Sequence, residues 1–179
     1  MKKLTIVFFL ALAAIFIFPN DLQAQKFKKL DKSPMDLAAF PRRGSKKVVK
    51  VYYSRPQLKG RALSKLAPKG KVWRTGANEA TEITFYQDVK IGGQALKAGT
   101  YTLFTIPDDE QWTLIINSKL HQWGAYTYKE KNDVLRSKGS VKTKKKLTEA
   151  FTMTFDKNKN GADLVLGWGN VIVRFPIEF

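Results

Sequence analysis

Apolar and polar residues alternate in short runs along most of this chain, and this pattern constrains the fold more than any other feature. In residues 49–54, Val49, Val51 and Tyr53 share one face, while the residues between them share the other. Similar runs occupy residues 81–86, 89–91, 100–106, 111–117, 150–156, 163–168 and 171–179. Successive side chains of a β-strand point to opposite faces, so each run is typical of a strand with one buried face.

Clusters of glycine, proline, asparagine and aspartate separate these runs, as they do between the strands of all-β domains. Beyond the N-terminal segment no helical periodicity extends over ten or more residues, and residues 120–135 suggest at most a turn of helix. The pattern therefore predicts an all-β fold, a single antiparallel β-sandwich that is jelly-roll-like in architecture.

The N-terminal segment, residues 1–24, has the organisation of a secretory signal peptide. Lys2 and Lys3 precede the apolar run 4–18, and Ala24 supplies a small residue at a cleavage site. The apolar run is shorter than the roughly 20 residues that a membrane-spanning helix needs. We therefore expect an exported protein, periplasmic or extracellular, with no transmembrane segment once residues 1–24 are removed.

The next segment, residues 25–47, is basic and is interrupted by Pro34 and Pro41. Proline lacks a backbone donor and charged side chains favour solvent, so we expect an irregular N-terminal arm here. The β-sandwich domain is expected to occupy residues 48–179. A chain of 179 residues that is 44% hydrophobic has enough apolar material for one core.

The chain contains no cysteine and only one histidine, His121. These counts exclude disulfides, thiol catalysis, iron–sulfur clusters and cysteine zinc sites. The aspartates match no calcium-binding loop, and we find neither a serine nucleophile motif nor a glycine-rich phosphate loop. We therefore expect no metal and no cofactor.

The chain is strongly basic, with 32 Lys and Arg against 15 Asp and Glu and a formal charge of +17. Cations gather in residues 26–29, 42–47 and 138–146, which we expect to lie in the arm and in a late loop. Such clusters attract polyanions by counterion release. They lack the interleaved aromatic residues that stack nucleic acid bases, so an anionic envelope polymer is the expected polyanion and nucleic acid is not.

The segment 71–81 (KVWRTGANEAT) has the densest mixture of polar and aromatic side chains, and it precedes a predicted strand. Loops at the rim of a rigid sheet often carry binding residues. With two cations from the preceding segment, the ligand-binding hypothesis comprises Arg55, Arg61, Trp73, Arg74, Asn78 and Glu79. In it, the indole provides an apolar platform, Arg61 and Arg74 hold anionic or carbonyl oxygens, and the other two polar groups fix orientation.

A structural interpretation of the same residues stays open. Arg74 or Arg61 would pair with Glu79, and Asn78 would cap amides of the loop, which makes the segment an internal staple.

The mature chain resembles the domain of unknown function 2911 family. The resemblance is carried by YYSRP (52–56), KGR (59–61), KVWRTGANEAT (71–81), VKIGGQALKAGTYTLFTIP (89–107) and QWTLIIN (111–117). It covers about residues 33–178, nearly all of the mature chain. It implies an exported, mostly-β protein of Bacteroidetes-type bacteria, and it supplies no catalytic residues.

Three functions remain open from the sequence. The first is a non-catalytic ligand-binding or structural module of the bacterial cell envelope, with a small polar ligand as partner. The second is an envelope hydrolase of a glycan or ester, in which Glu79 is the acid or base and a second group such as Asp36, Asp88 or His121 lies within roughly 5–10 Å. The third is electrostatic docking to an anionic envelope polymer. The oligomeric state does not follow from the sequence.

Overall fold

The computed structural model describes residues 26–179, so the predicted signal peptide lies outside the described residues. The chain divides into two units, 1–30 and 31–179, and every element below belongs to the second unit. The strands are β1 (Met35–Phe40), β2 (Val49–Ser54), β3 (Thr81–Phe85), β4 (Val89–Ile91), β5 (Gln94–Leu96), β6 (Gly99–Ile106), β7 (Gln111–Asn117), β8 (Asp133–Lys157) and β9 (Gly161–Glu178). The helical elements are α2 (Leu63–Leu66) and a 3-10 turn, η1 (Glu130–Asn132). None of the helices within residues 26–179 has the length and apolar character needed to cross a membrane.

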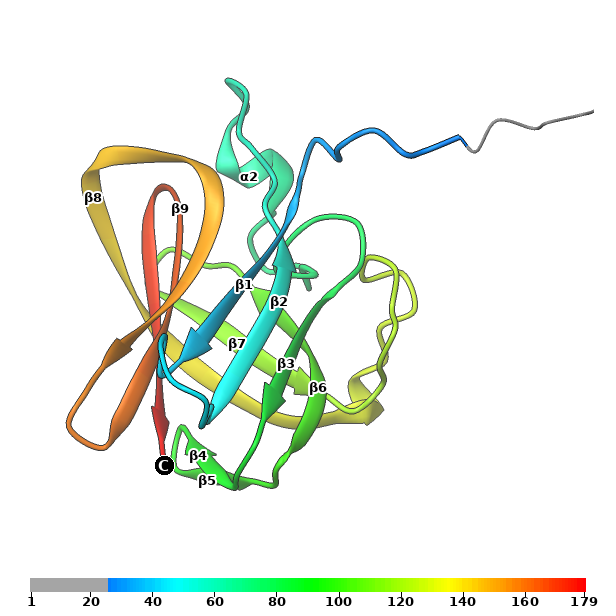
Figure 1. The fold of residues 1–179 in the computed structure, drawn as a ribbon. Coiled ribbons are helices and arrows are strands. Elements are labelled where there is room, and N and C mark those ends of the chain that lie inside the picture. Colours follow the sequence, from blue (N-terminus) through cyan, green and yellow to red (C-terminus); the bar gives the residue numbers. More distant parts are fainter. Residues whose placement is uncertain (1–25) are drawn as a thin grey trace, which may run out of the picture. The chain divides into compact units, whose positions relative to one another are not determined.

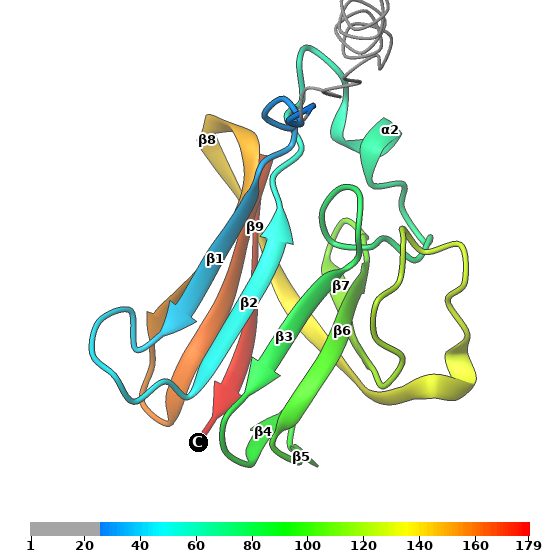
Figure 2. The same ribbon diagram turned by 45° about the vertical axis from the view of Figure 1, so that its right-hand side comes forward.

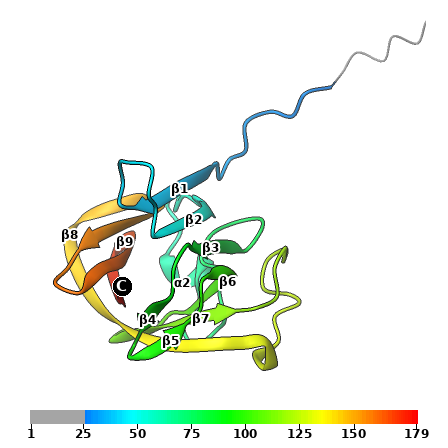
Figure 3. The ribbon, with the colours of Figure 1, turned by 60° about the horizontal axis from the view of Figure 1, so that its bottom comes forward.

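The strands join in the order β1-β2-β3-β6-β7-β8-β9-β4-β5, and each neighbouring pair is antiparallel (Figure 1). The sheet folds over along β8, because residues 133–140 of this strand pair with β7 whereas residues 140–157 pair with β9. Figure 2 shows β1, β2, β3 and β6 side by side with β9 behind them, and Figure 3 shows β8 curving from one layer to the other. This confirms the predicted all-β, sandwich-like antiparallel fold.

The hairpin of β4 and β5 completes the second layer, although its sequence lies between two strands of the first. Gly92 and Gly93 form its turn with φ values of 59° and 77°. Positive φ at both central positions is the geometry of a two-residue hairpin turn that matches the twist of the strands, and glycine adopts it without strain. The hairpin pairs with the end of β9 through Lys90 opposite Glu178.

An aromatic cluster fills the space between the layers. Trp73 is only 6% exposed and stacks on Trp168, with ring centroids 5.4 Å apart. Its ring also packs edge-on against Phe151 at 5.0 Å and Trp112 at 6.1 Å. Mutual backbone hydrogen bonds with Thr105 hold Trp73 in this position, although it lies outside the named strands. Burial of large rings is a main source of core stability, so this residue is part of the core.

The structure differs from the sequence-based expectations in two segments. β1 lies within residues 25–47, the segment expected to be irregular, and it pairs along its length with β2. Among the described residues it is an edge strand paired with β2, and its six residues include a single buried side chain, Ala38, so its alternation pattern is short and weak. The basic segment 138–146, expected in a loop, belongs to β8. Much of this stretch is exposed, so its strand pairing does not require alternating apolar residues.

Candidate ligand-binding site

The structure does not bring the six residues of the ligand-binding hypothesis together, and Arg55 shows why. Its Nε donates to the backbone carbonyl of Phe151 at 3.0 Å, and its Nη1 lies 3.1 Å from Oδ2 of Asp36. These contacts tie the end of β2 to β1 and β8. Arg55 therefore has a structural role within the sheet.

Arg61 and Trp73 also do not share a surface hollow with Asn78 and Glu79. Arg61 donates from Nε to the carbonyl of Leu58 at 2.9 Å, so its guanidinium closes its own turn. Trp73 is in the aromatic core described above and offers no exposed platform. Neither Arg61 nor Arg74 forms an ion pair with Glu79 within residues 26–179, so the pairing expected of an internal staple is not observed there.

Arg74 occupies an unusual environment. It follows the buried Trp73, and its Nη1 lies only 3.2 Å from the point where a side chain on Gly124 would begin. Its Nε is buried and has no hydrogen-bond partner in the described part of the chain. A buried donor without an acceptor is costly, so this Nε lowers the stability of the fold.

Asn78 and Glu79 lie on the surface, in a segment that pairs with the loop after β7. The amide of Ala80 donates to the carbonyl of Gln122 at 2.8 Å, and the amide of Gly124 donates to the carbonyl of Asn78 at 3.0 Å. Asn78 has a φ of 58°, a left-handed conformation that asparagine tolerates better than most residues. The backbone around Glu79 is thus fixed on both sides.

Two adjoining surface hollows meet at Glu79. Their volumes are about 210 Å³ and about 260 Å³, and they share Met35, Ser54 and Glu79. The first also includes Tyr52, Tyr53, Ala80 and Glu82, and the second also includes Asp31, Ser33, Asn78 and Trp123. We call this combined surface the Glu79 hollow. Asn78 and Glu79 are the two residues of the sequence hypothesis that line it.

Large apolar side chains are exposed along the Glu79 hollow. Met35 is 63% exposed, Trp123 is 60% exposed and Tyr52 is 43% exposed. Tyr52 on β2 lies directly opposite Glu82 on β3, so both belong to the outward face of the first layer. Exposed aromatic rings beside polar side chains can contact both the apolar and the polar parts of a small ligand.

Glu82 is held in a fixed orientation by the loop after β7. Its Oε1 accepts a hydrogen bond from the backbone amide of His121 at 3.0 Å, and the imidazole Nδ1 of the same residue lies 3.4 Å away. The imidazole is 86% exposed, so the backbone contact provides most of the fixation. His121 is thus next to the hollow and contacts one of its two glutamates.

The base of the same loop is anchored by a hydrogen-bonded cluster. Tyr128 donates from Oη to Asp133 Oδ2 at 2.7 Å, and Asn117 donates to Oδ1 of the same carboxylate at 2.8 Å. Arg136 donates to both Tyr128 Oη and Asp133 Oδ2. Burial and the hydrogen bond to Asp133 raise the pKa of Tyr128 to about 12. The loop that carries Trp123 is therefore fixed at both ends.

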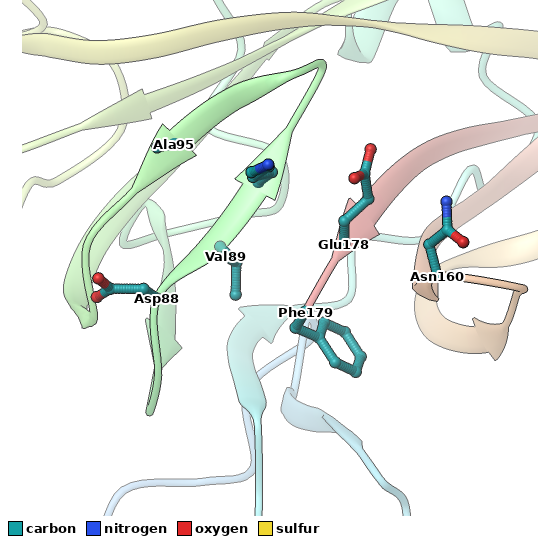
Figure 4. Close-up of a pocket in the computed structure, with 7 residues that line it drawn as sticks. Asp88, Val89, Ala95, Asn160, Glu178 and Phe179 are labelled. Carbon is teal, nitrogen blue, oxygen red and sulfur yellow. The ribbon is translucent and has the colours of Figure 1, made fainter.

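A third hollow, of about 370 Å³, lies beside β4, β5 and the end of β9 (Figure 4). Figure 4 shows the carboxylate of Asp88 directed away from Glu178. Asp88 accepts hydrogen bonds from Lys97 Nζ at 2.7 Å and from the Ala98 amide at 2.9 Å, and the lysine lowers its pKa. Its carboxylate is thus engaged in local contacts, and the two acids do not converge on one point.

The sequence hypothesis missed Met35, Tyr52, Glu82 and Trp123 as members of one surface. Tyr52 and Glu82 alternate with the buried residues of their strands, so the sequence pattern places both side chains on the outward face of the sheet. The contribution of Trp123 depends on the pairing of its loop with residues 78–80, and no local pattern shows that pairing. Within residues 26–179 no group of three or more His, Asp or Glu side chains is arranged to hold a metal ion.

Comparison with known proteins gives a match to a protein family. No curated protein and no solved structure matches the chain. A family model described as "Protein of unknown function (DUF2911)" matches residues 33–177, which contain every strand of the sheet apart from the last residue of β9. This match confirms the resemblance seen in the sequence motifs. The chain belongs to the DUF2911 family.

Proposed function

We propose that this protein is an exported, non-catalytic binding module of the bacterial cell envelope, and that its Glu79 hollow holds a neutral, polyhydroxylated ligand such as a glycan. The observation that carries the proposal is the position of Glu79, which lies exposed between two hollows edged by Met35, Tyr52 and Trp123. The signal-peptide pattern of residues 1–24 supports export.

The exposed rings suit a sugar because one face of a sugar ring presents C–H groups and its edge presents hydroxyl groups. The C–H face packs on aromatic rings such as those of Trp123 and Tyr52, which bury large areas at little entropic cost. Carboxylate and amide oxygens of Glu79, Glu82 and Asn78 then accept hydrogen bonds from hydroxyl groups. The hollow thus supplies both kinds of contact.

The charge of the hollow differs from that of the chain. The protein has 32 Lys and Arg residues, yet none of those within residues 26–179 lines either part of the Glu79 hollow. The acidic groups Asp31, Glu79 and Glu82 line it instead. Carboxylates repel anions, so this surface favours a neutral ligand and does not favour the anionic ligand that the arginines suggested.

The hollow is also preorganised. Trp123 is paired with Glu79 through a backbone bridge, and Glu82 is oriented by the amide of His121. A ligand would therefore meet groups that are already in position, which reduces the entropic cost of binding.

A glycan hydrolase is the second candidate, because Glu79 and Glu82 line the same hollow. Glycoside hydrolysis requires two carboxylic groups on either side of the bond, and Glu79 and Glu82 would supply them in the first part of the hollow. In this alternative Glu82 replaces Asp36 and Asp88 as the second group, since those two aspartates are engaged by Arg55 and Lys97.

The test is a thermal-shift and calorimetric screen of neutral oligosaccharides on the chain that begins at residue 25. We expect a hit whose affinity falls at least tenfold in Trp123→Ala. The matched control is Tyr126→Ala, on the same loop, because this ring is 81% exposed and lines neither part of the hollow. A screen without a hit, or equal losses in both variants, would refute the proposal.

The same screen separates binding from hydrolysis. After incubation with the bound oligosaccharide, chromatography would show intact sugar for a binding module. Cleavage that is abolished in Glu79→Gln would establish the hydrolase instead.

A further inference from the structure

A basic protrusion lies on β8, and none of its residues lines the Glu79 hollow. Thr143 pairs with Val171, and the next pair is Thr148 with Gly169. Four residues of β8, 144–147, therefore stand opposite the single residue Asn170 of β9. Figure 1 shows β8 arching wide of β9 at the top of the molecule. We call residues 144–147 the β8 bulge.

Side-chain hydrogen bonds hold the β8 bulge in its conformation. The side-chain amide of Asn170 donates to the backbone carbonyl of Lys144 at 3.0 Å and to that of Lys145 at 3.4 Å. Lys144 in turn donates from Nζ to Thr148 Oγ1. Bulges in paired strands redirect side chains, and these contacts fix the direction in which the following residues point.

The tip of the bulge combines cations with an apolar side chain. Lys145 and Lys146 are exposed, and Leu147 is 52% exposed. None of the three lysines of the bulge forms an ion pair within residues 26–179. The nearest acid in the sequence, Glu149, instead accepts a hydrogen bond from the backbone amide of Lys59 at 2.6 Å.

From this combination we infer that the β8 bulge docks the protein onto an anionic lipid surface. Each lysine near such a surface raises the affinity about fivefold, and an apolar side chain beside them adds affinity by entering the interface. A soluble polyanion would use the lysines and would leave Leu147 in water. The exposed leucine is therefore the observation that favours a membrane over a polymer.

The experiment is co-sedimentation with phosphatidylcholine vesicles, with and without phosphatidylglycerol, using the chain that begins at residue 25. We expect binding only to the anionic vesicles, with an affinity that falls as salt rises. The double variant Lys145→Glu/Lys146→Glu should lose at least tenfold in affinity, because two attractions become two repulsions. The matched control is Lys28→Glu/Lys29→Glu, which makes the same charge change in the N-terminal segment.

The role of Leu147 is tested separately. Leu147→Ser should weaken vesicle binding several-fold while it leaves binding of a soluble polyanion, dextran sulfate, unchanged. Because the chain has no cysteine, Leu147→Cys carrying an environment-sensitive fluorophore reports the position directly. We expect a blue shift on anionic vesicles.

Three outcomes would overturn the inference. The first is equal loss of binding in the two charge variants, which would mean that total charge alone matters. The second is wild-type vesicle binding by Leu147→Ser together with tight binding of dextran sulfate at the bulge, which would make the partner a polymer. The third is no binding to anionic vesicles. All these positions are exposed, and circular dichroism before each assay verifies that the variants are folded.

Discussion

Glu79 and Trp123 are paired across an isolated antiparallel bridge, although Glu79 lies just before β3 and Trp123 lies in the loop after β7. This bridge places a carboxylate and an exposed indole on the same surface. The indole of Trp73, six residues before Glu79, is buried in the core instead. The structure therefore assigns different roles to two tryptophans that are both neighbours of polar residues in the sequence.

The two tryptophans should differ sharply in their effect on stability. Trp73→Ala removes a ring that contacts Trp112, Phe151 and Trp168, and we expect a loss of about 3–5 kcal/mol in the free energy of unfolding. Trp123→Ala removes a ring that is 60% exposed and should cost less than about 1 kcal/mol. Urea denaturation of both variants measures the difference, and similar losses would contradict the assignment.

Gly124 should tolerate alanine less well than Gly70 does. Both have a φ of 67°, so a side chain costs roughly 1–2 kcal/mol at either position. At Gly70 a Cβ would meet nothing within 4 Å, whereas at Gly124 it would lie 2.7 Å from the Tyr126 ring and 3.2 Å from Arg74 Nη1. We therefore expect the larger loss of stability in Gly124→Ala, measured by urea denaturation. Equal losses would show that the loop is free to relax around Arg74.

Alkaline pH should weaken the anchor of the same loop. The folded-state pKa of Tyr128 is raised from 10.0 to about 12 by burial and by the hydrogen bond to Asp133. The folded state thus favours the neutral phenol. The contribution of this group is fully present below pH 10 and is lost as the pH rises through 12, because only the unfolded chain loses the proton readily in that range.

Tyr128→Phe isolates this contribution. We expect the stability difference between wild type and Tyr128→Phe to shrink between pH 10 and pH 12, as followed by urea denaturation at several pH values. A difference measurement is needed because burial also raises the pKa of Tyr53. If the difference between the two proteins were constant over this range, the hydrogen bond to Asp133 would not depend on the phenol proton.

The strands could be predicted because most of them have one buried face. β2, β3, β6 and β7 all alternate or consist of β-branched and aromatic residues, and their bounds agree with the sequence pattern within a residue or two. The middle of β8 could not be predicted in this way. There Lys142 and its neighbours pair with β9 while much of their surface remains in solvent, so the backbone is in a strand without the alternation that reveals one.

The candidate site could be predicted only in part, for a related reason. Asn78 and Glu79 stand in a segment whose local composition indicates a loop at the rim of a sheet, and they do lie on the surface hollow. Arg55 and Arg61 carry the same kind of side chain as a ligand-binding arginine, but backbone carbonyls occupy them. Which acceptor a guanidinium meets depends on the tertiary structure.

The contrast between Arg74 and Arg55 leads to the last prediction. Arg74 has a buried Nε without an acceptor in the described part of the chain, whereas Arg55 binds both Asp36 and the carbonyl of Phe151. A methionine keeps much of the length of the side chain and removes its donors. Arg74→Met should therefore change the free energy of unfolding by less than about 1 kcal/mol or increase it, because an unsatisfied buried donor is lost. Arg55→Met should lower it by about 1–3 kcal/mol, because a part-buried carboxylate and a carbonyl lose their partner.

Urea denaturation of the two variants at neutral pH gives both values, and the oligosaccharide titration on the same samples shows whether Arg74 also takes part in binding. An Arg74→Met protein of nearly unchanged or higher stability and unchanged affinity is the expected outcome, since Arg74 lines neither part of the Glu79 hollow. A loss of more than about 1 kcal/mol in Arg74→Met would mean that the guanidinium finds an acceptor in solution. Loss of affinity at unchanged stability would instead place Arg74 among the ligand contacts, as the sequence had suggested.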